Sequence, residues 1–211
     1  MEPSNLQTRF TIPVNNTRPK GTACFELWAP KLKRRIKLFD PFHVQLWALL
    51  ESNPRVSAYC ERPVYWCHDE RQQLINFWCR AGRREVCWVV TAEPQQPHAG
   101  VLSQGQDIDV RYVHAKSLAT RTIWIENWMH ILPYLSSNAR FVSEQLLADI
   151  ELATVKAQTL GEIEREFQPH DIVLVRTAAF MLLHRGRLKA DALRVHPLGS
   201  EIRLRRVRAH E

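Results

Sequence analysis

The alternation of apolar and polar residues is clearest between Gln72 and Val90, in the stretch QQLINFWCRAGRREVCWVV. Two apolar runs, residues 74–79 and 86–90, flank a short charged loop that ends in Arg83, Arg84 and Glu85. Short apolar runs joined in this way are typical of a β-hairpin. We therefore predict a hairpin in the core of a sheet.

The residues before this hairpin predict a helix and short strands. Asp40 and Pro41 suit a helix start, as an N-cap acid followed by proline at the first helical position. Phe42, Leu46, Leu49 and Leu50 recur at helical spacing, and Pro54 ends the helix. Strands are expected at residues 56–59, 63–66 and 107–113. This order predicts an α/β domain.

The last third of the chain has helical spacing followed by two short strands. Residues 124–135 form a bridge dense in aromatic residues, and Ser136–Asn138 should cap a helix over residues 141–156. A short helix should run from the capping box Thr159/Glu162 to Phe167, and a further helix over 171–184 should end at Gly186. Two strands are expected at 192–195 and 202–207, joined by a turn at 196–199. This order of elements is that of a winged helix, and an ordinary helical lobe with a hairpin fits the periodicity equally well.

The net charge of +7 is concentrated at the two ends of the chain. Residues 1–40 hold eight Lys or Arg against three Asp or Glu, and residues 185–211 hold the same numbers. Two basic ends indicate a polyanionic partner, most plausibly nucleic acid. Solvated basic faces that only aid solubility are the alternative.

The cysteine pattern and the hydropathy bear on the type of protein. The five cysteines (24, 60, 67, 79 and 87) include no C-x-x-C pair, so free, buried, reduced thiols are expected rather than a zinc site. The sequence has no apolar run of about 20 residues and no basic start followed by an apolar stretch. We expect a cytoplasmic protein that does not span a membrane.

Three segments give the chain a resemblance to the TnsA family, the endonuclease subunits of Tn7-type heteromeric transposases. They are LWALLESNPRVSAYCERPVYW (46–66), LINFWC (74–79) and LVRTAAFMLLHRGRLKADALRVHPLGSEIRL (174–204). Arg62-Pro63 stands where the family usually has Gln-Pro, and LINFWC falls on its aromatic-Thr-Pro-Asp-Phe strand. The resemblance implies a restriction-endonuclease-like domain with a mixed sheet and helices, followed by a C-terminal winged-helix domain.

The resemblance also assigns catalytic positions, and all of them have lost the required residue type. The family cuts DNA with a helix glutamate, a strand aspartate and an acid-x-Lys motif, which bind Mg²⁺ and help to activate water. The corresponding positions here are near His43, at Asn76, and at Trp88 to Val90. Neither a full set of carboxylates nor the lysine is present, so no catalytic residue and no cofactor are expected.

The function implied is that of a catalytically inactive TnsA-like transposition protein. It would bind double-stranded transposon-end DNA and bridge a DDE transposase and an AAA+ ATPase regulator. One alternative is an active Mg²⁺-dependent endonuclease whose carboxylates have moved, with Asp69, Glu70, Glu85 and Glu93 as candidates. Another is a winged-helix DNA-binding regulator.

The residues expected to bind DNA lie in the two basic segments. They are Lys31, Lys33, Arg34, Arg35, Lys37, Arg203, Arg205, Arg206 and Arg208. The expected domains are a basic arm (1–37), the nuclease-like domain (38–135) and the winged helix (136–211). We further expect the former active site to be closed and partly filled by Trp88, with Asn76 and His43 close by.

Overall fold

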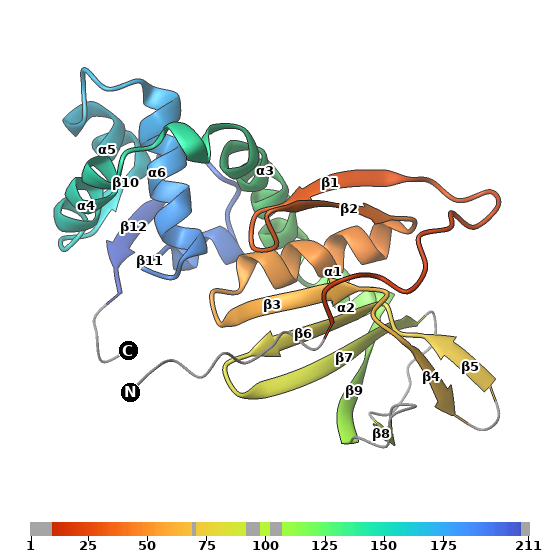
Figure 1. Cartoon of the computed structure of the whole chain (residues 1–211). Coiled ribbons are helices and arrows are strands. Elements are labelled where there is room, and N and C mark those ends of the chain that lie inside the picture. The colour runs from red at the N-terminus through yellow and green to blue at the C-terminus, as the bar shows by residue number, and fades with distance from the viewer. Residues whose placement is uncertain (1–9, 69–70, 92–97, 102–106, 208–211) are drawn as a thin grey trace, which may run out of the picture. The chain divides into compact units, whose positions relative to one another are not determined.

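The computed structural model describes residues 10–68, 71–91, 98–101 and 107–207 (Figure 1). Its contacts divide the chain into two compact units. The first holds the chain up to Leu27, together with Lys31–Leu50 and Arg55–Ala119. The second holds Trp28–Pro30, Glu51–Pro54 and the chain from Thr120 onward. The domain boundary expected at residue 136 lies inside a helix of the second unit.

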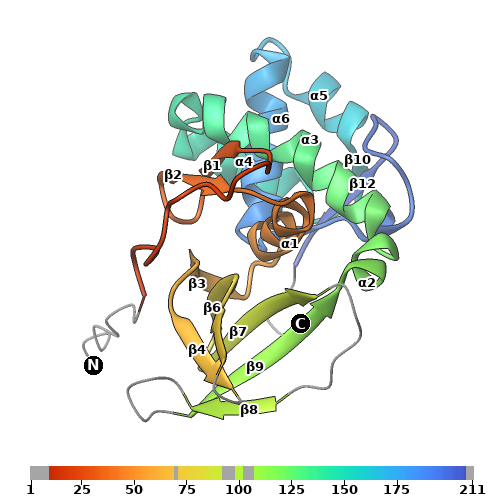
Figure 2. The same ribbon diagram turned by 90° about the vertical axis from the view of Figure 1, so that its right-hand side faces the viewer.

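Strands dominate the chain up to residue 119. The elements are β1 (Phe25–Ala29), β2 (Arg34–Leu38), α1 (Pro41–Ser52), β3 (Val56–Glu61), β4 (Tyr65–His68), β5 (Arg71–Leu74), β6 (Phe77–Ala81), β7 (Arg84–Thr91), β8 (His98–Val101), β9 (Asp107–His114) and α2 (Ala115–Ala119). Five of them form one sheet in the order β3-β6-β7-β9-β8, which Figure 2 shows with β8 at the bottom of the view. Because β7 and β9 run parallel and the other neighbours antiparallel, the sheet is mixed, as predicted.

The predicted hairpin is confirmed as β6 and β7. Phe77 pairs with Trp88 and Trp78 pairs with Cys87, with the turn at Gly82, whose positive φ of 62° favours glycine. The first strand begins at Phe77 rather than at Leu74. Leu74 instead ends β5, where it pairs with Tyr65 of β4.

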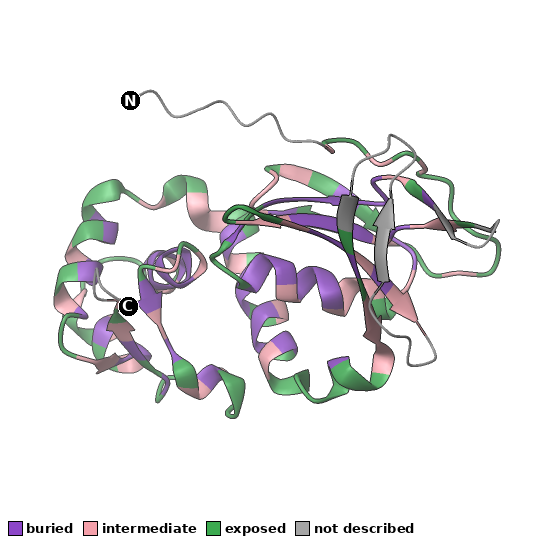
Figure 3. Ribbon diagram, turned by 90° about the horizontal axis from the view of Figure 1, so that it is seen from below, coloured by how far each residue is buried: buried purple, intermediate pink, exposed green. Residues whose placement is uncertain are grey.

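Alternation along these strands gives the sheet two apolar faces. On one face Tyr59 and Phe77 pack against α1, where Trp47 Nε1 donates a hydrogen bond of 2.8 Å to the Tyr59 hydroxyl. On the other face Trp78 is fully buried in a cluster that also contains Trp66 of β4. Phe10, before β1, packs on Trp78 with ring centroids 5.6 Å apart. Figure 3 shows the resulting burial along the central strands.

The second half of the segment expected as a basic arm (1–37) contains regular structure. Residues 25–29 and 34–38 form the two-stranded sheet β1-β2. In β2 the buried residues Ile36 and Leu38 alternate with exposed Arg35 and Lys37, which is the pattern of a strand with one buried face. Five of the seven residues at 31–37 are Lys or Arg, and these charges obscured the alternation in the sequence.

The second unit is mainly helical. Its elements are α3 (Thr122–Asn138), the 3-10 turn η1 (Ala139–Phe141), α4 (Glu144–Ala153), β10 (Gln158–Thr159), α5 (Leu160–Glu166), α6 (Ile172–His184), β11 (Leu188–Lys189), the 3-10 turn η2 (Asp191–Arg194) and β12 (Arg203–Arg206). The three strands form one sheet in the order β10-β12-β11. The capping box at Thr159 and Glu162 is confirmed, with hydrogen bonds of 3.1 and 2.7 Å.

Three details of the second unit differ from the prediction. The aromatic bridge is the helix α3, which continues through Pro133. The helix that follows is capped by Ser143, whose hydroxyl accepts a hydrogen bond from Leu146 N, and not by residues 136–138. Residues 192–195 fall in and next to η2, and β12 pairs instead with β11 at Leu188 and Lys189.

Gly186 ends α6 as predicted, with a positive φ of 72°. A Cβ at this position would lie 2.6 Å from Cβ of Pro54, a residue of the same unit. Both the left-handed backbone and the close approach therefore require glycine here.

Candidate functional site

The position assigned to a metal-binding aspartate is held by Asn76, between β5 and β6. Asn76 N donates to Trp88 O over 3.0 Å, and Asn76 O accepts from Arg62 N over 2.9 Å. The side-chain oxygen Oδ1 accepts from Val90 N over 2.6 Å. The amide thus satisfies a backbone donor of β7 at the point where the pairing with β6 begins. Asn76 works as a structural acceptor, and its oxygen is already in use.

Trp88 lies directly across from Phe77 and is half-buried. Its Nε1 donates to Cys79 Sγ over 3.1 Å, and the Arg111 guanidinium lies 5.9 Å from its ring centroid. These contacts come from β6 and β9, the two neighbours of β7. The indole therefore packs across the neighbouring strands β6 and β9.

His43 of α1 approaches the same place through Phe77. The His43 and Phe77 rings meet edge to face with centroids 6.5 Å apart. Burial lowers the pKa of His43, so its imidazole is neutral at pH 7. The structure thus brings His43, Asn76 and Trp88 into one neighbourhood around Phe77, and the expected proximity of Asn76 and Trp88 is confirmed.

Of the four carboxylates considered for a displaced nuclease site, only Glu85 lies in the described part of the chain. Asp69, Glu70 and Glu93 lie outside the described part of the chain. Glu85 pairs with Arg80, so its side chain lies on the same face of the sheet as Trp78. Trp78 Nε1 donates a hydrogen bond of 3.1 Å to Glu85 Oε2. Trp88 lies on the opposite face. In the part of the chain that the structure describes, no three His, Cys, Asp or Glu side chains come together to hold a metal ion.

The role of Asn76 gives a direct prediction about stability. We expect Asn76→Leu to lower the free energy of unfolding by about 1–3 kcal/mol, because Val90 N–H loses its acceptor. Asn76→Asp keeps an oxygen at the same place and should cost less. Urea denaturation followed by tryptophan fluorescence measures both. Equal losses for the two variants would show that the hydrogen bond to Val90 is not what Asn76 provides.

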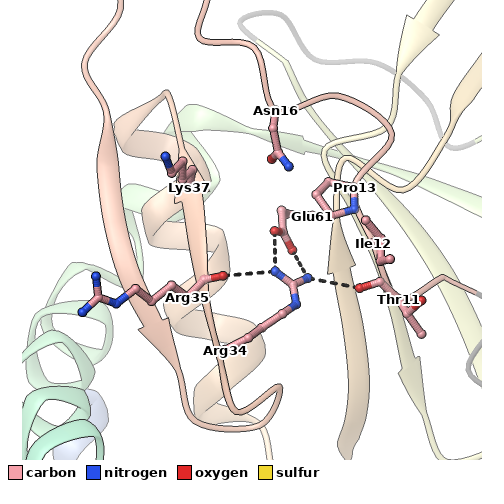
Figure 4. Close-up of a pocket in the computed structure, with 8 residues that line it drawn as sticks. All are labelled: Thr11, Ile12, Pro13, Asn16, Arg34, Arg35, Lys37 and Glu61. Carbon is pink, nitrogen blue, oxygen red and sulfur yellow. Dashed lines mark hydrogen bonds and ion pairs between the residues drawn. The ribbon is translucent and has the colours of Figure 1, made fainter.

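The first basic segment separates into buried and exposed members. Arg34 turns inward and forms a bidentate pair with Glu61, with nitrogen–oxygen distances of 2.7 and 2.6 Å (Figure 4). The Glu61 side chain is only 2% exposed, and its hydrogen bond raises the pKa of Arg34. Lys31 Nζ donates to Leu50 O at the end of α1 over 2.8 Å. Lys31 and Arg34 are therefore structural residues.

The remaining cations of this segment, Lys33, Arg35 and Lys37, are exposed. Arg35 and Lys37 occupy alternate positions of β2, about 6.6 Å apart on its exposed side, and Lys33 lies in the turn just before β2, with a positive φ of 52°. Lys37 also forms an ion pair of 3.0 Å with Glu26, and both side chains are half exposed. Surface pairs of this kind contribute little and are easily exchanged for another anion. A polyanion can reach all three side chains, which we call the β2 row.

Arg62 is a buried structural residue whose role was missed in the sequence. Its guanidinium donates to Lys37 O over 2.7 Å, to Asn16 Oδ1 over 2.7 Å and to Asn15 O. Burial lowers its pKa. Arg62 thus holds residues 15–16 and the end of β2 beside β3. Beside it, a hollow of about 300 Å³ is lined by Thr11–Pro13, Asn16, Glu61 and β2 (Figure 4).

The second basic segment is also divided between exposed and paired arginines. Arg203 on β12 is exposed. Arg206 Nε lies 3.3 Å from Glu151 Oε1, and Arg187 forms a second ion pair with Glu151. The Glu151 side chain is only 10% exposed. Arg208 lies outside the described residues, so its expected role has no structural counterpart here.

The thiols differ from expectation at one position. Cys60, Cys79 and Cys87 are free and buried, and burial raises the pKa of Cys60 to about 12. Cys24 is free but exposed, and the side chain of Cys67 is not described. The buried thiols therefore act as small apolar side chains in the core.

Comparison with protein-family models and with curated proteins gives no match for this sequence. Among the described residues, no helix is long and apolar enough to cross a membrane.

Proposed function

We propose that this chain is a non-catalytic, TnsA-like transposition subunit that binds double-stranded DNA. One observation carries the proposal. At the position that the resemblance assigns to a metal-binding aspartate, the Asn76 side chain accepts a backbone hydrogen bond from Val90 at 2.6 Å. A neutral oxygen used in this way is a poor ligand for Mg²⁺, which prefers carboxylates and water.

Two features of the architecture support the family assignment within this proposal. The helix α1 precedes an antiparallel set β3-β6-β7, and β9 then adds parallel to β7. In the second unit, the order α4-β10-α5-α6-β11-β12 with the sheet β10-β12-β11 is that expected of a winged helix. One feature departs from the usual connection of parallel strands, which runs through a helix. Between the parallel strands β7 and β9, the described part of the connection is the strand β8.

The burial of α6 favours backbone binding over base recognition. In a winged helix this helix reads the bases. Here eight of its residues are buried: Val175, Thr177, Ala178, Ala179, Phe180, Met181, Leu182 and Leu183. Arg176 is paired with Glu164 and His184 with Glu51. The same burial argues against a winged-helix regulator that reads sequence through α6. We propose that the β2 row and the exposed Arg203 contact phosphates.

The proposed partners follow from the assignment. A subunit that binds a transposon end without cutting it would act by assembly, together with a DDE transposase and an AAA+ ATPase. The exposed β2 row supplies charge for DNA, and other surfaces remain for protein contact.

The test measures DNA binding and cleavage in the same preparation. We expect the full chain to bind duplex DNA, without nicking supercoiled plasmid in Mg²⁺ or Mn²⁺. Replacing Lys33, Arg35 and Lys37 by glutamine should weaken binding and reduce the slope of log K against log salt by about 0.9 for each lost phosphate contact. Fluorescence anisotropy over a salt series measures the slope.

A matched control removes the same charge from another exposed part of the first unit. Arg83, Arg84 and Lys116 are all exposed, and their replacement by glutamine should leave the slope close to that of the parent. An equal loss in both triple variants would show a general charge effect and no β2 site. Metal-dependent nicking abolished by Glu85→Ala would instead support an active endonuclease.

A further inference from the structure

A hollow in the second unit combines arginines with exposed aliphatic side chains. It has a volume of about 500 Å³, within the usual range for ligand pockets of about 300–1,000 Å³. Its walls come from Glu151 and Val155 at the end of α4, from Arg187 after α6, and from residues 205–207 at the end of β12. All of these residues belong to the second unit. We call this surface the α4–β12 hollow.

The charge of the hollow is positive, and its arginines are held in place. Glu151 pairs with one terminal nitrogen of Arg187 and with Nε of Arg206. A guanidinium has five N–H donors, so each keeps donors free for a further acceptor. Both arginine side chains remain 46% exposed. Two arginines thus share one carboxylate, and the anchored guanidinium groups lose less entropy on binding.

Apolar surface lies at the same rim. Val155 is 63% exposed. A single exposed aliphatic side chain is ordinary on a protein surface. Here, however, Val155 lines the hollow together with a second aliphatic residue, Val207, and with the arginines. Nucleic-acid backbone would satisfy the arginines and leave these aliphatic groups without a partner.

We propose that the α4–β12 hollow docks an acidic, amphipathic segment of a partner protein. Its carboxylates pair with Arg187 and Arg206, where the fork of N–H donors suits bidentate binding. Its aliphatic or aromatic side chains cover Val155 and Val207. A symmetric second copy of this chain fits less well, because it would bring the same arginines face to face.

The test begins with a phage-displayed library of random peptides, selected on the full chain. We expect enriched peptides to combine Asp or Glu with Leu, Ile or Phe. With a synthetic enriched peptide in fluorescence polarisation, Arg187→Gln and Val155→Ser should each weaken binding by about tenfold. Arg165→Gln and Ile172→Ser, at exposed positions on α5 and α6, should leave it unchanged.

Three results would overturn the proposal. The first is enrichment of no acidic and apolar peptide, or of peptides indifferent to both Arg187→Gln and Val155→Ser. The second is loss of duplex DNA binding in Arg187→Gln with no effect of Val155→Ser, which would assign the hollow to nucleic acid. The third is a dimer in sedimentation that Val155→Ser abolishes, which would assign it to a second copy. Val155 is exposed, so its variant remains informative even if Arg187→Gln is unstable.

Discussion

Replacing Arg34 by alanine is expected to lower the free energy of unfolding by about 3 kcal/mol, because it leaves a buried carboxylate without its partner. The Glu61 side chain is 2% exposed and holds Arg34 through two hydrogen bonds. By contrast, Arg35→Ala removes an exposed cation from the next position and should change stability by less than about 0.5 kcal/mol. Urea denaturation of both variants measures the difference.

The double variant Arg34→Met with Glu61→Leu supplies the control for this prediction. Apolar residues of similar size often replace a buried ion pair with little loss, so the double variant should recover much of the stability. The DNA-binding salt slope of Arg34→Ala should equal that of the parent at temperatures where the variant is folded. A normal stability together with a reduced slope would instead make Arg34 a phosphate contact.

Truncating Trp78 should have the largest effect of any single substitution in the first unit. We expect Trp78→Ala to lower the free energy of unfolding by about 3–5 kcal/mol, since the residue is fully buried and its removal leaves a cavity. It would also remove the surface on which Phe10 packs. Thermal unfolding and limited proteolysis near residue 10 measure the two effects.

Trp78→Phe is the matched variant, because it keeps an aromatic ring in the cluster and leaves a smaller void. Trp78→Phe should lower the free energy of unfolding by much less than Trp78→Ala does. A normal melting temperature for Trp78→Ala would contradict the assignment of Trp78 to the centre of this core.

The elements that could be predicted from the sequence are those specified by adjacent residues. The hairpin β6-β7 follows from two apolar runs around a short loop, and α5 follows from the reciprocal hydrogen bonds of Thr159 and Glu162. The helix α3 was missed because Pro133 and its dense aromatics do not suggest a continuous helix. The strand β11 was misplaced because two residues that pair across the chain give no local signal.

The candidate site was predictable only in part, for a related reason. The proximity of Asn76 and Trp88 follows from the hairpin itself. The division of the basic segment does not, since Lys33, Arg34 and Arg35 look equivalent in the sequence. Only the partner Glu61, 27 residues away, decides which of them turns inward. For the same reason, the ion pairs of Glu151 with Arg187 and Arg206 could not be predicted from the sequence.

The interleaved composition of the second unit determines how the protein can be dissected. Because this unit includes Glu51–Pro54, a fragment that starts at Thr120 lacks several of its own parts. Such a fragment would miss the Glu51 carboxylate 2.7 Å from His184, the Ser52 hydroxyl that accepts from Trp124, and the proline beside Gly186. No single cut in the chain yields two complete folding units. Binding should therefore be assigned to one unit by point substitution within the intact polypeptide.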